Sequence, residues 1–212
     1  MTTTQHESPA GNRLAGAAQE QRHRPQLVLV SVLTSGCALV YAIYRGYYAA
    51  GGTVGMIGVP RSESQFRLLN LAAVGVLLVA AVLPLAVLPW WRRPGLRRVL
   101  LALCWVVAVG CVMHALIDDV QRVVSLAGGR DVTYPASEWL SIDRFAADVQ
   151  DLAFNEVFFL VEGLLWAVLA WIGLGNATSR RRWVGTAVVA TAALTVVGLL
   201  SAFGVIGRAI VL

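Results

Sequence analysis

The sequence predicts an all-α fold, a polytopic membrane bundle of five transmembrane helices with one short interfacial helix. Hydrophobic residues make up 58% of the 212 residues, and the mean hydropathy is +0.69, which a soluble domain with a polar surface does not reach. Five runs approach or exceed the roughly 20 apolar residues that cross a hydrocarbon core. They lie at about 27–50, 68–90, 99–127, 151–175 and 184–210.

The distribution of charge divides the chain and orients it. Residues 1–26 are polar and predict a disordered cytoplasmic tail, whereas residues 27–212 predict a single transmembrane domain. All 17 basic residues are arginines, which we interpret as the codon bias of a GC-rich bacterial genome. Three lie in the tail, four between 92 and 98, and three at 180–182. The positive-inside rule predicts a protein of the bacterial plasma membrane with a cytoplasmic N-terminus.

The first span ends in aromatic and cationic residues. Tyr41, Tyr44, Arg45 and Tyr48 fall on or beside one helical stripe near its outer end. They form either an aromatic belt with a snorkelling arginine or a ring of aromatic side chains around the mouth of a pocket. The glycine-rich stretch 51–55 then ends the helix.

The second span is expected to run from Phe66 to Trp90, with Asn70 in its first turns. Pro84 lies inside this span and predicts a kink. Trp90 marks the inner interface, and the basic loop follows it directly. Indole and arginine side chains together would fix the depth of this helix.

The third span carries a polar face in its outer half. His114, Asp118 and Arg122 follow one another at intervals of four residues. His114 can therefore hydrogen-bond to Asp118, and Asp118 can form an ion pair with Arg122. One interpretation is a helix end that leaves the lipid. The other is a functional site, because His114 lies about one turn deeper.

The outer segment 138–150 precedes the fourth span. Its apolar residues recur every three or four positions, at Trp139, Ile142, Phe145 and Val149. This spacing predicts an amphipathic helix on the outer interface, placed to act as a lid over a cavity.

The fourth span is an apolar run that contains acids. At 3.6 residues per turn, Asp151, Asn155, Glu162 and Trp166 fall on one stripe, with Glu156 roughly a quarter-turn away. A charged carboxyl near the bilayer centre costs about 2.5–3.5 kcal/mol, so it should face protein or a water-filled cavity. We therefore take Glu162 as the residue around which the site is organised.

The fifth span contains no acid. Small residues form a line at Thr191, Thr195, Gly198 and Ala202. Such a line is typical of a face that packs against another membrane helix, so we expect this span to support the bundle without contributing chemistry.

Three stretches carry a family resemblance, namely residues 47–55, residues 66–91 with the basic turn that follows, and residues 155–163. Together they resemble an uncharacterised family of small bacterial four-helix integral membrane proteins, a domain of unknown function. The resemblance covers about residues 40–175 and implies no activity. Arg45 stands where a histidine is common in that family, and Glu162 stands at a position that tends to be apolar.

A second resemblance concerns spacing. His114 and Asp118 on one helix, followed by Asn155, Glu156 and Glu162 on a later one, are similar to the arrangement in sterol-isomerase-like membrane proteins. Small integral-membrane terpene cyclases use acids within a helical bundle in a comparable way. This resemblance implies protonation of an alkene by helix-borne acids.

These features favour an enzyme that acts on a lipophilic, isoprenoid-like small molecule by protonation-initiated cyclisation or isomerisation. Glu162 would be the general acid, and His114 with Asp118 would take the proton back. The expected catalytic residues are Glu162, His114, Asp118 and Glu156. The expected substrate-binding residues are Tyr41, Tyr44, Arg45, Tyr48, Asn155, Phe158, Phe159 and Trp166, whose aromatic rings attract cations. No cofactor or metal is expected, because the sequence has no P-loop, GxGxxG or zinc spacing.

A different interpretation is a non-catalytic membrane protein: a small-molecule binder, an efflux or immunity component, or a subunit of a larger complex. In that case Arg45 would neutralise Glu162 or Glu156 across the bundle. Membrane lipids are expected as partners and nucleic acid is not, because the arginine loops between spans are only a few residues long. No oligomeric state is predicted. A third, less favoured interpretation is a metal site built from Cys111, His114, Asp118 and Glu162.

Overall fold

The computed structural model describes residues 9–130, 132, 134 and 137–206. Its elements in chain order are α1 (Pro9–Ala49), β1 (Gly58–Pro60), α2 (Glu63–Ala86), the 3-10 helix η1 (Leu88–Arg92), α3 (Pro94–Leu126), β2 (Trp139–Ile142), α4 (Arg144–Gln150), the π-helical turn η2 (Asp151–Asn155), α5 (Glu156–Gly173) and α6 (Ala177–Ala202). In the described part of the chain, five helices are long and apolar enough to cross a membrane. The fourth of them runs without a break through α4, η2 and α5. The predicted five-span fold is confirmed.

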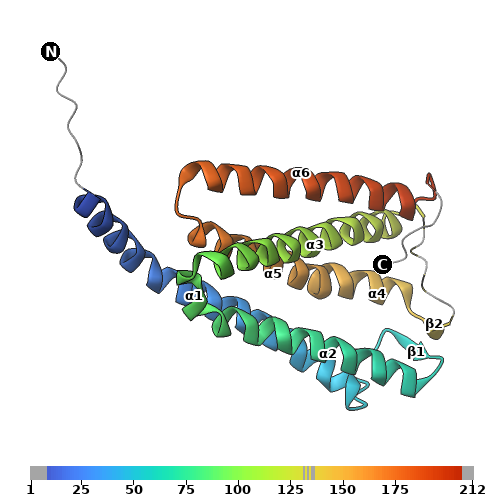
Figure 1. Cartoon of the computed structure of the whole chain (residues 1–212). Coiled ribbons are helices and arrows are strands. Elements are labelled where there is room, and N and C mark those ends of the chain that lie inside the picture. Colours follow the sequence, from blue (N-terminus) through green and yellow to red (C-terminus); the bar gives the residue numbers. More distant parts are fainter. Residues whose placement is uncertain (1–8, 131, 133, 135–136, 207–212) are drawn as a thin grey trace.

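The five spans form an open row (Figure 1). Helix α1 packs against α2 on one side and α5 on the other, and α3 packs against α5 and α6. The order across the row is therefore α2, α1, α5, α3, α6. Helices α2 and α6 stand at its two edges and are the least buried of the five spans.

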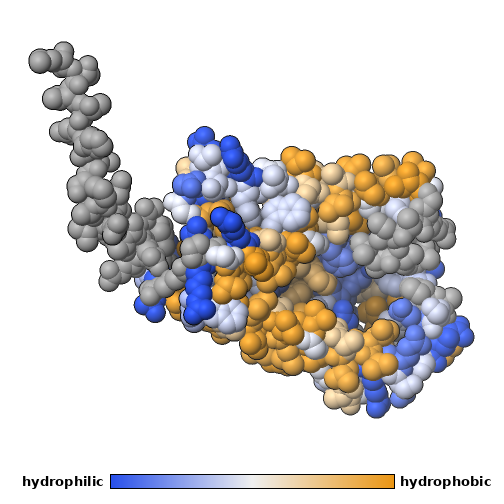
Figure 2. Space-filling view, viewed as in Figure 1, coloured by the Kyte–Doolittle hydropathy of each residue, from blue (hydrophilic) through white to orange (hydrophobic). Residues whose placement is uncertain are grey.

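One face of the molecule is apolar along the middle of the helices and polar toward their ends. Figure 2 shows hydrophobic side chains over the middle of this face and hydrophilic side chains toward its two ends. The same view shows the face hollowed between the α1–α2 pair and the α3–α5 pair, with hydrophilic side chains inside the hollow. Polar groups at this depth need partners within the protein, because lipid offers none.

Helix α1 begins earlier than expected. It starts at Pro9, within the segment 1–26 for which the sequence predicted a disordered tail. The part from 14 to 24 consists mainly of leucine, alanine, glutamine, glutamate and arginine, all strong helix formers. Extending an existing helix also avoids the unfavourable nucleation step, so the apolar span can continue into this polar segment.

Helix α2 ends earlier than expected. The sequence predicted a kinked helix to Trp90, but the α-helix ends at Ala86, two residues after Pro84, and η1 follows. Pro89 explains the change, because its ring disfavours the α conformation of the residue before it and its nitrogen has no hydrogen to donate.

The segment 138–150 is only partly helical. The predicted amphipathic helix over 138–150 is wrong for its first part, because Trp139–Ile142 is strand β2, paired antiparallel with β1. Asp143 begins helix α4 instead, with its carboxylate accepting a hydrogen bond from the backbone N–H of Ala146. An N-cap aspartate has extended backbone geometry, which suits the end of a strand and the start of a helix.

The turn η2 changes the faces of the fourth span. A π-helical turn adds about one residue to the α-helical count, so side chains on its two sides shift by about 100°. The predicted stripe is therefore interrupted between Asp151 and Asn155, whereas Glu156 and Glu162 both lie on the regular helix α5. Glu156, expected a quarter-turn away, is 3% exposed and thus as buried as Glu162. Such turns often occur at functional sites.

Close contact between α3 and α5 holds the centre of the row. A Cβ atom on Gly163 would lie 2.9 Å from Cγ2 of Val112 and 3.2 Å from the carbonyl oxygen of Ala108. Only glycine lets the two backbones approach this closely. Toward the end of α5, Trp166 and Leu169 are almost completely buried against α3. The depth and rotation of α5 are thereby fixed relative to α3.

Candidate functional site

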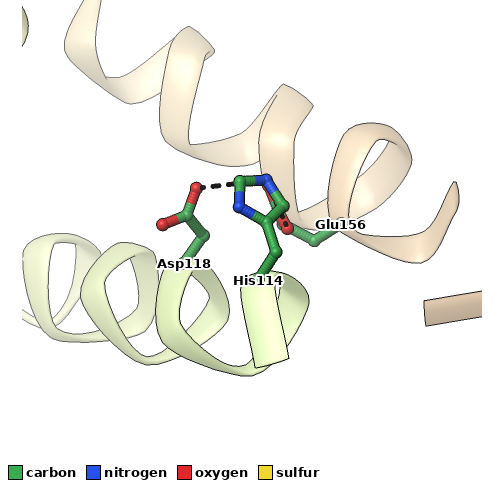
Figure 3. Close-up of side chains that lie close together, drawn as sticks. All are labelled: His114, Asp118 and Glu156. Carbon is green, nitrogen blue, oxygen red and sulfur yellow. Dashed lines mark ion pairs between the residues drawn. The ribbon is translucent and has the colours of Figure 1, made fainter. Parts of the chain in front are cut away.

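Three titratable side chains meet between α3 and α5 (Figure 3). Nε2 of His114 lies 3.8 Å from Oδ2 of Asp118, one turn further along α3. The same nitrogen lies 3.9 Å from Oε2 of Glu156, the first residue of α5. Figure 3 shows the two carboxyl groups pointing toward the imidazole from the two facing helices. We call these three residues the acid–histidine cluster.

The members of the acid–histidine cluster differ in burial. The side chain of Glu156 is 3% exposed, that of Asp118 14% and that of His114 26%. Oε2 of Glu156 is buried and has no hydrogen-bond partner among the described residues. The edge of the His114 ring meets Phe159, with 4.3 Å between ring centroids. Oδ1 of Asp118 accepts a hydrogen bond of 3.1 Å from Gln121, which holds its second oxygen toward the histidine.

Acids outnumber bases around this cluster. Asp118, Asp151 and Asp119 lie close enough to interact with the charge of Glu156, and Arg122 opposes them. Like charges at such distances repel in a medium of low dielectric constant. A proton or a cation is therefore favoured here.

The cluster also has the donor set of a metal site. His114, Asp118 and Glu156 each offer one ligand atom, and these atoms lie within 4.8 Å of one another. Around a tetrahedral ion with bonds of about 2.1 Å, ligand atoms are about 3.4 Å apart. The distances of 3.8 and 3.9 Å would thus have to shorten by a few tenths of an ångström.

Arg122 joins the C-terminal end of α3 to α4 and η2. Its guanidinium lies 3.2 Å from Oδ1 of Asp148 and 2.8 Å from Oδ2 of Asp151. It also donates to the Tyr134 hydroxyl over 2.6 Å, and Ser125 donates to Asp148 over 2.6 Å. Burial raises the pKa of the Tyr134 hydroxyl above its usual range, with Arg122 opposing this shift. We call Arg122, Asp148, Asp151, Tyr134 and Ser125 the Arg122 network.

The expected ion pair between Asp118 and Arg122 is not formed among the described residues. Arg122 instead pairs with Asp148 and Asp151, which two other elements bring to its guanidinium. Two carboxylates offer more stabilisation than one, and neither could be located from spacing along α3 alone. The basic side chain on α3 that lies within ion-pair distance of Asp118 is therefore His114 and not Arg122.

A chain of hydrogen bonds crosses the row from α5 to α2. Within η2, Nδ2 of Asn155 donates to Asp151, and Oδ1 of Asn155 accepts from the Tyr41 hydroxyl over 2.9 Å. Arg45 donates to that same hydroxyl over 3.1 Å and to Oδ1 of Asn70 over 3.3 Å. Helix α1 is thereby joined to both η2 and α2 through polar side chains.

Glu162 lies in a different environment. Its Oε1 accepts a hydrogen bond of 2.9 Å from the Trp166 indole, and its Oε2 is buried without a hydrogen-bond partner among the described residues. The thiols of Cys37 and Cys111 lie nearby. No ion pair or hydrogen bond within the described chain joins Glu162 to Arg45 or His114. The expected pairing of Arg45 with Glu162 or Glu156 is therefore not observed.

The predicted aromatic residues pack mainly on one another. Tyr41 is 3% exposed and stacks on Phe158, with ring centroids 4.0 Å apart. Tyr44 lies beside Tyr41 and meets Tyr48 edge to face, and Phe159 contacts both Phe158 and His114. These rings form an aromatic wall next to the acid–histidine cluster.

A cavity of about 260 Å³ lies between α1, the start of α2 and β2. Arg45 lines it, together with Phe66, Asn70, Glu138 and Trp139. The other residues predicted to bind substrate are not among its lining. The sequence did not indicate Phe66 or Trp139 as site residues, since only the pairing of β1 with β2 brings Trp139 beside α2.

Comparisons of the chain with models of known families, with curated proteins and with solved structures found no match.

Proposed function

We propose that this protein is an integral-membrane enzyme that isomerises or cyclises a lipophilic, isoprenoid-like molecule by proton transfer at the acid–histidine cluster. The observation that carries the proposal is the position of Glu156. Its carboxyl is 3% exposed, has an oxygen without a hydrogen bond in the described chain, and lies 3.9 Å from a histidine. A donor and an acceptor of protons thus lie next to each other.

Glu156 is the proton donor in this mechanism. Burial favours the uncharged form of a carboxyl, which is the form that can protonate an alkene. Transfer of the proton to one alkene carbon leaves Glu156 as a carboxylate and the neighbouring carbon as a cation. Loss of a proton from an adjacent carbon to Nε2 of His114 then forms the new double bond. Asp118, held by Gln121, stabilises the resulting imidazolium.

The aromatic wall supports a cationic intermediate. Phe159 borders His114, and Phe158 and Tyr41 stack directly behind it. The faces of such rings attract a positive charge without reacting with it. The aromatic wall also favours an isoprenoid-like substrate, because an isoprenoid chain has both an alkene to protonate and an apolar surface to pack against the rings.

In this proposal Glu156 takes the role that the sequence analysis gave to Glu162. The carboxyl of Glu162 is tied to Trp166 and surrounded by core residues. Glu156 instead lies beside a partly exposed histidine, which a substrate can approach from the lipid. We keep Glu162 as a residue that supports the packing of α5.

We also propose that the N-terminus lies in the cytoplasm of a bacterial cell. The arginines at 92–98 and at 180–182 support this orientation, because both groups lie in turns at the same end of the membrane helices (Figure 1). Reporter fusions after Arg98 and after Arg182 should both report cytoplasm. An outside signal from either fusion would contradict the orientation.

The function is tested by deuterium transfer from solvent. Membranes with the wild-type chain are incubated in heavy water with squalene, farnesol and geranylgeraniol, and the products are analysed by mass spectrometry. Protonation of an alkene places solvent deuterium in the product. Glu156→Gln should reduce this incorporation about 10²–10⁴-fold, and the matched variant Glu162→Gln should retain it. Absence of deuterium from every product, or equal activity of the two variants, would contradict the proposal.

A second candidate function is binding of a divalent cation by the same cluster. The observation that favours it is the surplus of acids around three ligand atoms within 4.8 Å. Addition of Co²⁺ to the purified protein would then give visible absorption bands that Glu156→Gln and His114→Gln remove. Deuterium transfer that a chelator abolishes and Zn²⁺ restores would favour this candidate over metal-free proton transfer.

A further inference from the structure

The cavity beside α2 is lined by Arg45, a cationic side chain without an anionic partner in the described chain. Arg45 reaches it from α1, near the outer end of the first span. Its Nη1 donates to Asn70 over 3.3 Å and its Nη2 to the Tyr41 hydroxyl over 3.1 Å, and both acceptors are neutral. Its Nε is buried and has no hydrogen-bond partner, and no carboxylate in the described chain lies within ion-pair distance.

The position of Arg45 is not that of a snorkelling side chain. A snorkelling arginine places its charged group in water at the interface. Here the side chain is only partly exposed, and its guanidinium lies 5.2 Å from the ring centre of Tyr41 and 5.9 Å from that of Tyr44. A charge held at this depth without a counter-charge is unfavourable. An anion in the cavity would remove that penalty.

The start of α2 adds a second positive contribution. Ser62, which caps this helix of 24 residues, lines the cavity together with Gln65 of the first turn. The N-terminus of a helix carries partial positive charge, which attracts anions, although the N–H groups of Gln65 and Phe66 are already bonded to Ser62. Glu138 is the one acid in the lining, and it is exposed, where water screens its charge.

The remaining lining is apolar and aromatic. Phe66 and Trp139 meet edge to face, with ring centroids 5.8 Å apart. Leu69 and Ala73 continue along α2 toward the middle of the membrane. A volume of about 260 Å³ is below the range of about 300–1,000 Å³ that is usual for drug-sized ligands. It suits a headgroup and the first carbons of a chain that continues along α2 in the lipid.

We infer that this cavity binds the phosphate or carboxylate headgroup of an amphiphile with an apolar tail, with Arg45 as its principal anchor. The inference rests on the proposed function in one respect, since it gives the isoprenoid-like substrate an anionic end. Tyr41 links the two places, because its hydroxyl contacts both Arg45 and Asn155, the residue before Glu156. Binding of a headgroup at Arg45 is thus connected through Tyr41 to the residue next to Glu156.

The test compares matched ligands with and without the charge. The full chain, purified in an uncharged detergent, is titrated with farnesyl phosphate, farnesol and inorganic phosphate by calorimetry. We expect farnesyl phosphate to bind at least tenfold more tightly than farnesol, and this preference to weaken as sodium chloride is raised. Inorganic phosphate should bind weakly, because it lacks the tail. Equal affinities for farnesyl phosphate and farnesol would overturn the inference.

Substitutions of Arg45 and Arg67 test whether the anion binds at Arg45. Arg45→Gln should bind the phosphate no better than the alcohol, whereas Arg67→Gln should behave as wild type, since Arg67 is exposed and pairs with Glu63 on α2. Arg45→Lys keeps the charge but loses the planar donor group, so an intermediate affinity is expected if Arg45→Gln does not fold. An unchanged preference in Arg45→Gln or in Arg45→Lys would contradict the assignment.

Two further experiments are needed. The first distinguishes a bilayer lipid from a soluble amphiphile as the ligand, and the second distinguishes failure of the headgroup site from failure of the proposed catalytic function. Competition by phosphatidylglycerol in nanodiscs, but not by phosphatidylcholine, would assign the site to a bilayer lipid, and no competition would assign it to a soluble amphiphile. Both results keep the anion site. Glu156→Gln should bind farnesyl phosphate like wild type while losing deuterium transfer. Failure of the headgroup site would instead abolish the preference for phosphate in a chain that still transfers deuterium.

Discussion

Oε2 of Glu156 faces Nε2 of His114 across 3.9 Å, and no hydrogen bond within the described chain satisfies that oxygen. A buried polar atom left without a partner costs about 1–3 kcal/mol. Such a cost persists where function requires the group. The stability of the protein and the activity of its cluster should therefore respond in opposite directions to one substitution.

Glu156→Gln should melt at the same temperature as wild type or a few degrees higher. The amide keeps the shape of the side chain and, like the protonated carboxyl, carries no charge for the surrounding acids to repel. The measurement is thermal unfolding in detergent at neutral pH. Glu138→Gln, at an exposed position, is the control, and it should change the unfolding free energy by no more than about 0.5 kcal/mol. A fall of several degrees in Glu156→Gln would show that Glu156 stabilises the fold through His114.

Arg122→Gln should destabilise the protein strongly. Its loss leaves Asp148 and Asp151 close together without a counter-charge, which costs about 3–5 kcal/mol for a buried pair. Unfolding should shift to a much lower temperature, and Asp148→Asn in the same chain should recover part of the loss. Arg130→Gln is the matched control, because Arg130 is exposed and donates only to a backbone carbonyl among the described residues. Similar effects of the two arginine variants would contradict the network.

Gly163→Ala should weaken the contact between α3 and α5. Its added methyl group would lie 2.9 Å from Val112, and overpacking of this kind costs about 1–3 kcal/mol. Gly110→Ala on α3 is the control, since a Cβ there meets nothing within 4 Å and alanine favours the helix. Thermal unfolding should rank Gly110→Ala at or above wild type and Gly163→Ala below it. The reverse order would mean that the helices are not in close contact at Gly163.

Tyr134→Phe should reveal a loss of stability at high pH. The pKa of Tyr134 is raised in the folded protein above the unfolded value of about 10. Its contribution to stability is therefore complete below about pH 10 and is lost as the pH rises through the folded value. The chain has no lysine, and its arginines remain charged in this window. Wild type should unfold at a higher temperature than Tyr134→Phe at pH 8, and this difference should shrink above pH 10. A constant difference would contradict the role of the hydroxyl.

The helices were predictable because membrane insertion leaves a strong signal in the sequence. Each apolar run has about the length that crosses a bilayer, and the arginines mark the turns between runs. Their ends were less predictable. Pro84 was read as a kink within a longer helix, whereas Pro89 ends the α-helical geometry before Trp90.

The site was predictable only in part. Spacing along one helix identified His114 and Asp118 as neighbours, because residues four apart share a face. It could not show that Arg122 pairs with Asp148 and Asp151, since those contacts depend on how α3 packs against α4 and η2. A regular period of 3.6 also placed Asp151 and Asn155 on the stripe of Glu162, because no sequence pattern announces the π-helical turn between them.

The π-helical turn η2 makes the contacts of the fourth span sensitive to the deletion of a single residue. Deleting one residue from Asp151–Asn155 would let the fourth span run as an ordinary α-helix and rotate one of its ends by about 100°. Gly163 holds α5 against α3, so the rotation would fall on α4 and move Asp148 away from Arg122. One in-frame deletion would thus break the ion pair between Arg122 and Asp148, which ties α4 to α3.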